Sequence, residues 1–78
     1  MKYVYILQSS NSENFYVGIA GDLRARLAKH NAGEVPHTSK YRSWQVKTYV
    51  AFRDEKRAFD FEKYLKSPSG RAFAKKRF

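Results

Sequence analysis

The sequence contains no cysteine, so disulfide bonds and thiolate metal sites are excluded. Only His30 and His37 remain as imidazole ligands, which argues against a zinc site. No apolar run approaches the roughly 18 residues that a membrane-spanning helix needs. The N-terminus also lacks the length and the small-residue cleavage site of a signal peptide. We therefore expect a cytoplasmic protein without a membrane segment.

Acidic residues are scarce as well. The chain has 7 Asp and Glu against 16 Lys and Arg, which gives a formal net charge of +9 on 78 residues. Such an excess favours a polyanionic partner, because binding to nucleic acid releases counterions. A solubilising surface, or binding to a ribosome or a membrane surface, would explain the same charge. The length predicts one domain, residues 1–78, near the lower size limit for a single core.

Glycines are few, and they do not form a recognised phosphate-binding loop. Gly18 and Gly21 do not fit the spacing of either common type. No nucleophile elbow indicates a serine hydrolase, and strands interrupt the helical patterns, which argues against a helix-turn-helix. The candidates for chemistry are therefore side chains carried by individual strands and helices.

Residues 2–8, 15–19 and 45–52 are predicted to be β-strands, because β-branched and aromatic side chains recur in them with a period of two. The first is largely apolar on both faces, so we expect it at the centre of the sheet. An antiparallel pair of the first two strands would bring Tyr5 and Tyr16 to the same face, although the pattern does not fix the register. In the third strand, the alternation predicts one shared side for Val46, Thr48, Val50 and Phe52.

Three helices are predicted from their start signals. Asp22 is the expected N-cap of a helix that runs to about Asn31. Asp54 precedes a second helix over residues 55–66, and Pro68 opens a short basic helix that runs towards the end of the chain. Together with the strands, these segments predict a mixed α and β architecture.

The first helix carries polar side chains next to its apolar stripe. At about 100° per residue, Leu23, Leu27 and His30 share the stripe, and Arg26 lies at its edge. We therefore expect Arg26 and His30 where the helix meets the sheet. A salt-bridged arginine and a buried structural histidine are the ordinary explanations of such positions.

Residues 33–44 are predicted to form a long loop that is rich in basic and hydroxyl side chains. Loops of about 12 residues are uncommon without a function. Lys40 and Arg42, together with Tyr41 and the hydroxyls, have a composition suited to phosphate contacts.

Glu62 is out of place in the second helix, because it falls in the same stripe as the apolar residues Ala58, Phe61 and Leu65. A carboxylate that faces a core is costly unless it is paired or binds a metal. An ion pair with a basic residue such as Arg26, or a side chain that reaches back to solvent, would explain Glu62 structurally.

The segments Tyr3-Val-Tyr5 and Tyr16-Val-Gly18, followed by Arg26 and His30, resemble the two-part signature of the GIY-YIG nuclease superfamily. The likeness is greatest to its small bacterial members, and it continues through Glu62-Lys-Tyr-Leu-Lys66 and Ser69-Gly-Arg-Ala-Phe73. Tyr3 replaces the glycine of the first motif, and Val4 and Val17 replace isoleucines. The polar residue, often asparagine, that larger members carry near the C-terminus has no counterpart in residues 67–78.

The resemblance implies an α+β fold, a three-stranded antiparallel sheet flanked by helices. It also implies an endonuclease that uses Mg²⁺ or Mn²⁺ to hydrolyse phosphodiester bonds of DNA, in repair or processing. Carried over by position, Glu62 is the metal ligand, and the catalytic residues are Tyr5, Tyr16, Arg26 and His30. Tyrosine has a pKa of about 10 and is a poor base at neutral pH unless Arg26 and the metal lower that value.

The expected partner is DNA, with RNA as the alternative, and a protein partner could supply specificity, because the chain has no second DNA-binding domain. A nucleic-acid-binding module that keeps the fold but cleaves little or not at all is the rival function, and a protein-binding scaffold is a third. Basic and polar side chains around the expected site are candidates for contacts with the nucleic acid: Arg24, Lys29, His37, Lys40, Arg42, Lys66 and Arg71.

Overall fold

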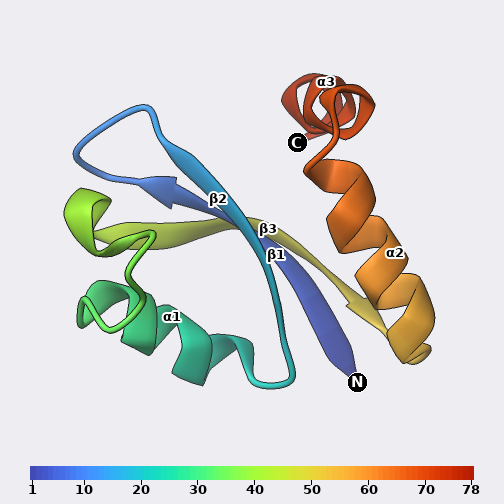
Figure 1. Ribbon diagram of the computed structural model, residues 1–78, viewed down its shortest axis with the longest axis horizontal. Coiled ribbons are helices and arrows are strands. Elements are labelled where there is room, and N and C mark those ends of the chain that lie inside the picture. Colours follow the sequence, from blue (N-terminus) through green and yellow to red (C-terminus); the bar gives the residue numbers. More distant parts are fainter.

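The computed structural model describes the whole chain, residues 1–78, and has an α+β architecture (Figure 1). Three antiparallel strands form one sheet in the order β2-β1-β3, and helices cover both of its faces. The elements follow along the chain as β1 (Lys2–Ser9), β2 (Phe15–Ala20), α1 (Leu23–Asn31), the 3-10 helix η1 (Ser39–Tyr41), β3 (Trp44–Phe52), α2 (Glu55–Leu65) and α3 (Pro68–Arg77). The expected three-stranded antiparallel sheet with flanking helices is confirmed.

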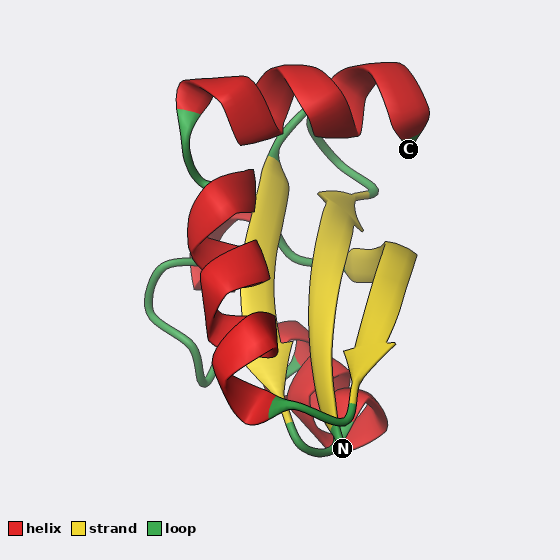
Figure 2. Cartoon of the chain, turned by 90° about the vertical axis from the view of Figure 1, so that its right-hand side faces the viewer, coloured by secondary structure: helices red, strands yellow, loops and turns green.

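The first strand is central, as predicted, because it is apolar on both faces. Val4 and Ile6 face α2, and Tyr5 and Leu7 face α1; all four side chains are buried. Figure 2 shows α2 running along one face of the sheet and α3 crossing its end. The sheet therefore separates two small cores, of which the one facing α1 contains Tyr5.

The strand β3 changes sides halfway along its length. Ile6 pairs with Thr48 but Leu7 pairs with Val46, so Lys47 is an extra residue in β3. Side chains alternate with a period of two, and one extra residue therefore turns Val46 onto the face of Leu7. Trp44 follows it into the same core. The prediction that Val46 shares a side with the later alternating residues of this strand is wrong.

The predicted helix starts are confirmed by their capping bonds. The Asp22 carboxylate accepts the Ala25 N–H at 3.0 Å, and the Asp54 carboxylate accepts the Arg57 N–H at 3.2 Å. Pro68 occupies the first turn of α3, as expected. None of the three helices has the length and apolar character of a membrane-spanning segment.

The segment predicted as a long loop is anchored at several points. It contains η1, and its last residue, Trp44, already belongs to β3. The Trp44 indole Nε1 donates to the Thr38 carbonyl oxygen at 2.9 Å, and the Asn31 side chain donates to the Trp44 carbonyl at 3.0 Å. Ser9 Oγ donates to the Tyr41 carbonyl at 2.6 Å. These bonds hold Thr38 against the end of α1.

Candidate active site

A line of hydrogen bonds runs from the centre of the sheet to the anchored segment. Tyr5 Oη lies 3.0 Å from His30 Nε2, and His30 Nδ1 lies 2.7 Å from Thr38 Oγ1. The three side chains are only 1–2% exposed. Thr38 Oγ1 donates its one proton to the Val35 carbonyl at 3.3 Å. With that proton engaged, the hydroxyl accepts from His30 Nδ1–H, and Nε2 then accepts the proton of Tyr5; we assign His30 this tautomer.

Gly18 makes room for the tyrosine of this line. Gly18 lies opposite Tyr5 in the β1–β2 register, and an added Cβ would overlap the Tyr5 hydroxyl and ring. Tyr16, two residues earlier on β2, lies on the same face, as expected. Its ring centroid is 4.9 Å from that of His30 and 6.4 Å from that of Tyr5. Two tyrosines and a histidine thus form one aromatic cluster beside the edge strand.

Burial fixes the protonation states of the cluster. It raises the pKa of Tyr5 to about 12, with smaller upward contributions from Tyr16 and Glu62 and a downward one from Arg26. Burial also lowers the pKa of His30, and the Arg26 charge lowers it further. Arg26 acts on Tyr5 in the expected direction, but burial outweighs it. At neutral pH, Tyr5 therefore keeps its proton and His30 is uncharged.

Arg26 is exposed on α1 and forms no ion pair or side-chain hydrogen bond within the protein. It lines a hollow of about 190 Å³, which it shares with Lys29 and with the turn at Gly21 and Asp22. A guanidinium that is not engaged elsewhere can bind a phosphate with two parallel hydrogen bonds. The structure therefore brings two cationic side chains, Arg26 and Lys29, to one hollow, and Arg26 lies one helical turn before His30 on α1.

Glu62 lies on α2 with its side chain 19% exposed. Its Oε2 accepts a hydrogen bond from Lys66 Nζ at 2.9 Å, so Glu62 does pair with a basic residue, but the partner is Lys66 and not Arg26. Its upward effect on the pKa of Tyr5 indicates that the carboxylate lies within electrostatic range of the tyrosine. The helix α2 packs on the sheet face opposite to the core that contains Tyr5, so Glu62 acts on the aromatic cluster only through this small electrostatic contribution.

A divalent metal at Glu62 would have one protein carboxylate as its ligand. No group of three or more His, Cys, Asp or Glu side chains gathers anywhere in the chain. Magnesium often binds through one or two carboxylates together with water and substrate phosphates. Glu62 fits that pattern through its Oε1, which accepts no hydrogen bond from the protein, whereas the Lys66 ammonium at Oε2 would compete with a metal.

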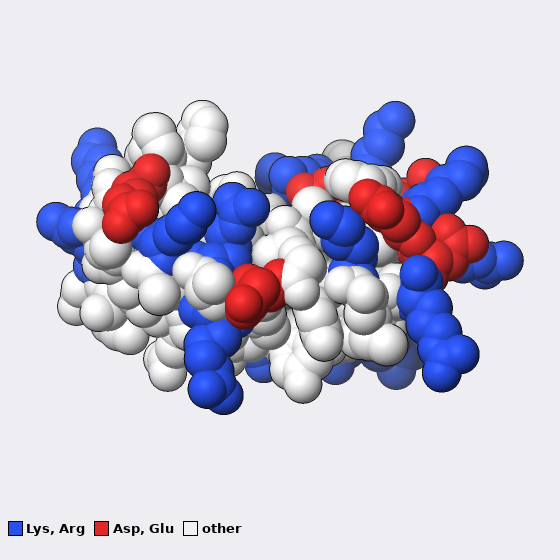
Figure 3. All heavy atoms as spheres, turned by 90° about the horizontal axis from the view of Figure 1, so that it is seen from below, with Lys and Arg blue, Asp and Glu red and all other residues white.

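The remaining basic candidates do not form a single patch. Lys66 is paired with Glu62, whereas Arg24 lines a different hollow on the opposite side of α1 from Arg26. Basic side chains extend along the whole of the face seen in Figure 3, with acidic ones among them. Four further candidates are exposed and line neither of these hollows: His37, Lys40, Arg42 and Arg71.

Thr38 is the residue of this site that the sequence analysis did not identify. Its hydroxyl was grouped with others as a candidate phosphate contact, yet it is 1% exposed and bonded to His30. A buried histidine needs a partner for each ring nitrogen. That requirement, applied to His30 and the nearby hydroxyls, would have pointed to residues 38 and 39 as candidates.

The sequence as a whole matches one known protein family. The family model described as the GIY-YIG catalytic domain matches residues 1–77 of the 78. No curated protein and no solved structure was found to match the chain. The chain belongs to the GIY-YIG catalytic-domain family, which implies nuclease-type hydrolysis of phosphodiesters, a nucleic-acid substrate and a divalent metal.

Proposed function

We propose that this protein is a divalent-metal-dependent endonuclease that cleaves DNA during repair or processing. The observation that carries the proposal is the unpaired Arg26 beside the buried hydrogen-bonded line of Tyr5, His30 and Thr38. A phosphate-binding cation next to a neutral, oriented base is what hydrolysis of a phosphodiester requires.

The protein's own residues would divide the work as follows. Arg26 binds the phosphate and stabilises the charge that develops on its oxygens, a bidentate task that lysine performs less well. Glu62 holds Mg²⁺ or Mn²⁺, whose chemistry when bound is the neutralisation of charge on phosphate and leaving oxygens. Tyr16 is half-buried against His30 and forms a wall of the site.

Tyr5 and His30 would move the proton of the attacking water together. Tyr5 is protonated at neutral pH, so its phenolate is too rare to act as the base. Its oxygen accepts a proton from water as its own proton passes to His30 Nε2, 3.0 Å away. The products of this step are a hydroxide directed at phosphorus and an imidazolium. Thr38 Oγ1 keeps the bond to Nδ1–H throughout.

The test is a cleavage assay with branched, nicked and single-stranded DNA, with Mg²⁺, with Mn²⁺ and with chelator. Arg26→Ala and Glu62→Ala should each lower the metal-dependent rate by roughly 10²–10³. Arg57→Ala and Asp60→Ala are matched controls, since both residues are exposed on α2. Cleavage that survives both active-site substitutions comes from a contaminant and rejects the proposal.

A nucleic-acid-binding module without cleavage is the second candidate, and the Glu62–Lys66 pair favours it. A carboxylate already neutralised by lysine has less to gain from a metal. This function predicts salt-sensitive binding of nucleic acid that Glu62→Ala leaves unchanged, and no products in any metal.

A further inference from the structure

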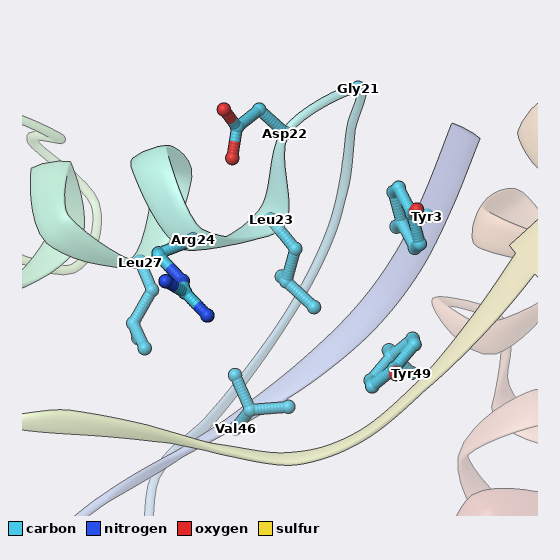
Figure 4. A pocket seen from close by; sticks show the side chains of 8 residues that line it. All are labelled: Tyr3, Gly21, Asp22, Leu23, Arg24, Leu27, Val46 and Tyr49. Carbon is cyan, nitrogen blue, oxygen red and sulfur yellow. The ribbon is translucent and has the colours of Figure 1, made fainter. Parts of the chain in front are cut away.

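A second hollow, of about 550 Å³, lies on the other side of α1 from Arg26 (Figure 4). We call it the tyrosine groove. Figure 4 shows the Tyr3 and Tyr49 rings on neighbouring strands at one end and aliphatic side chains at the other. Its main lining residues are Tyr3, Leu23, Arg24, Leu27, Val46 and Tyr49.

The groove exists because α1 is too short to cover the sheet. Its nine residues cover Tyr5 and Leu7 but leave the other end of that face open. The bulge in β3 turns Val46 onto this face, where it contributes to the floor. Tyr49 stays 54% exposed, and its ring meets only that of Tyr3, edge to face at 5.8 Å. An exposed aromatic ring thus stands over an apolar floor.

The charge at the groove complements a ligand that is both flat and anionic. Arg24 reaches from α1 into the groove and forms no ion pair. Asp22 is the one acidic lining residue, and its carboxylate is engaged in capping α1. A nucleobase attached to its phosphate suits a tyrosine ring beside an arginine, since bases of any sequence stack on aromatic side chains.

The groove adjoins the hollow that Arg26 lines. Gly21 and Asp22 line both hollows, so the two meet at the turn between β2 and α1. Nothing lies within 4 Å of a Cβ added at Gly21, so the surface of this turn is open. A strand whose phosphate rests at Arg26 can cross there and extend its neighbouring base towards Tyr49.

We propose that the tyrosine groove binds an unpaired nucleobase next to the bond that is cleaved. The inference rests on the proposed nuclease function and narrows its substrate to nucleic acid with a single-stranded segment at the site. A base inside a duplex is paired and stacked, and it can enter such a groove only after leaving the stack. Flaps, frayed ends and junctions between single and double strands meet this requirement.

The test measures binding in chelator, by fluorescence anisotropy, to single-stranded, flapped and fully paired DNA. Tyr49→Ala should weaken binding to the first two by about tenfold, the loss expected for one stacked base, and leave the duplex unchanged. Tyr49→Phe keeps the ring and should bind as the wild type does. Phe59→Ala is the matched control, because Phe59 is 48% exposed but lies on α2.

The outcomes separate this inference from the nuclease proposal. Equal losses on single strand and duplex, or a Tyr49→Ala variant no weaker than Phe59→Ala, overturn the groove as a base site. If the wild-type protein nevertheless cleaves DNA, the nuclease proposal stands and only the groove proposal is rejected. A Tyr49-dependent preference for single strands without cleavage in any metal supports the groove and rejects the nuclease. No nucleic-acid binding at all rejects both.

Discussion

At the scale of single residues, the candidate site includes one buried hydroxyl, that of Thr38, which the local sequence gives no reason to single out. Tyr5, Tyr16, Arg26 and Glu62 could be identified because each is a polar or aromatic side chain at a telling position of a strand or helix. Thr38 could not, because its bonds to His30 and to the Trp44 indole depend on how the anchored segment folds back. Its surroundings in the chain resemble any polar loop.

Thr38→Val should therefore lower the free energy of unfolding and disturb the tautomer of His30, the proposed base. The substitution keeps the shape but leaves His30 Nδ1–H without its acceptor, which costs about 1–3 kcal/mol. Urea unfolding measures that loss, and ¹⁵N chemical shifts of His30 report whether the proton stays on Nδ1. Thr38→Ser should restore both properties, and Ser39→Ala is a control at a neighbouring hydroxyl. An unchanged tautomer in Thr38→Val would contradict the assigned role.

The pH dependence of cleavage distinguishes the two bases that this site could use. If neutral His30 receives the proton through Tyr5, the rate rises only up to the lowered pKa of His30, below its usual value of about 6.5. Above that pH the rate should be level to pH 9. A free Tyr5 phenolate, with its pKa at about 12, would instead give a rate that rises tenfold per unit across the same range.

The same shift affects stability. Because folding lowers the pKa of His30, the unfolded chain binds that proton more readily. The contribution of His30 to the free energy of unfolding is then fully present above about pH 6.5, and it decreases as the pH falls below that value. Urea unfolding between pH 7.5 and 5.5 should show the loss in the wild type and in His37→Gln, but not in His30→Asn. A slope that His30→Asn retains would assign it to other groups.

At the scale of elements, the starts of the helices were predictable and the geometry of β3 was not. Capping by Asp22 and Asp54 involves residues only three positions away, so the signal lies in the local sequence. The bulge at Lys47 leaves no such trace, because β3 reads as an uninterrupted alternation. It is set by which core Trp44 fills, and this depends on contacts with distant parts of the chain.

Deletion of Lys47 tests how firmly the bulge is required. Without the extra residue, Trp44 and Val46 would turn to the opposite face, and the buried indole would lose its bond to Thr38. We expect a lower melting temperature and red-shifted fluorescence from the one tryptophan of the chain. Lys47→Ala keeps the register and should retain both values. A deletion variant with wild-type emission would show that β3 accommodates either register.

At the scale of the whole molecule, a net charge of +9 is spread along a body of about 29 × 25 × 17 Å. Composition alone favoured a polyanionic partner over a merely solubilising charge. It could not show that Arg26 and Arg24 face different hollows, because this depends on how α1 is set on the sheet. In the proposed function, the distributed charge attracts nucleic acid and the unpaired side chains of Arg26 and Arg24 position it.

Binding of nucleic acid should therefore weaken steeply as the salt concentration rises. The slope of log K against log salt should report the number of phosphate contacts. Removing one phosphate contact from a single strand reduces the slope of log K against log salt by about 0.7. Arg26→Ala should show this reduction, and Arg57→Ala should keep the wild-type slope. Titrations of single-stranded DNA at several salt concentrations measure it. Equal slopes for the two variants would place Arg26 away from the phosphate.

The placement of Tyr5 in the core facing α1 has a consequence for how such a domain evolves. A lineage that no longer needs cleavage still needs the ring and the buried bonds of Tyr5 and His30 to fold. Arg26 is exposed and forms no ion pair, so folding constrains it less than it constrains Tyr5 once selection on cleavage ends. Among descendants of this fold, the arginine is therefore a better marker of retained activity than the tyrosine.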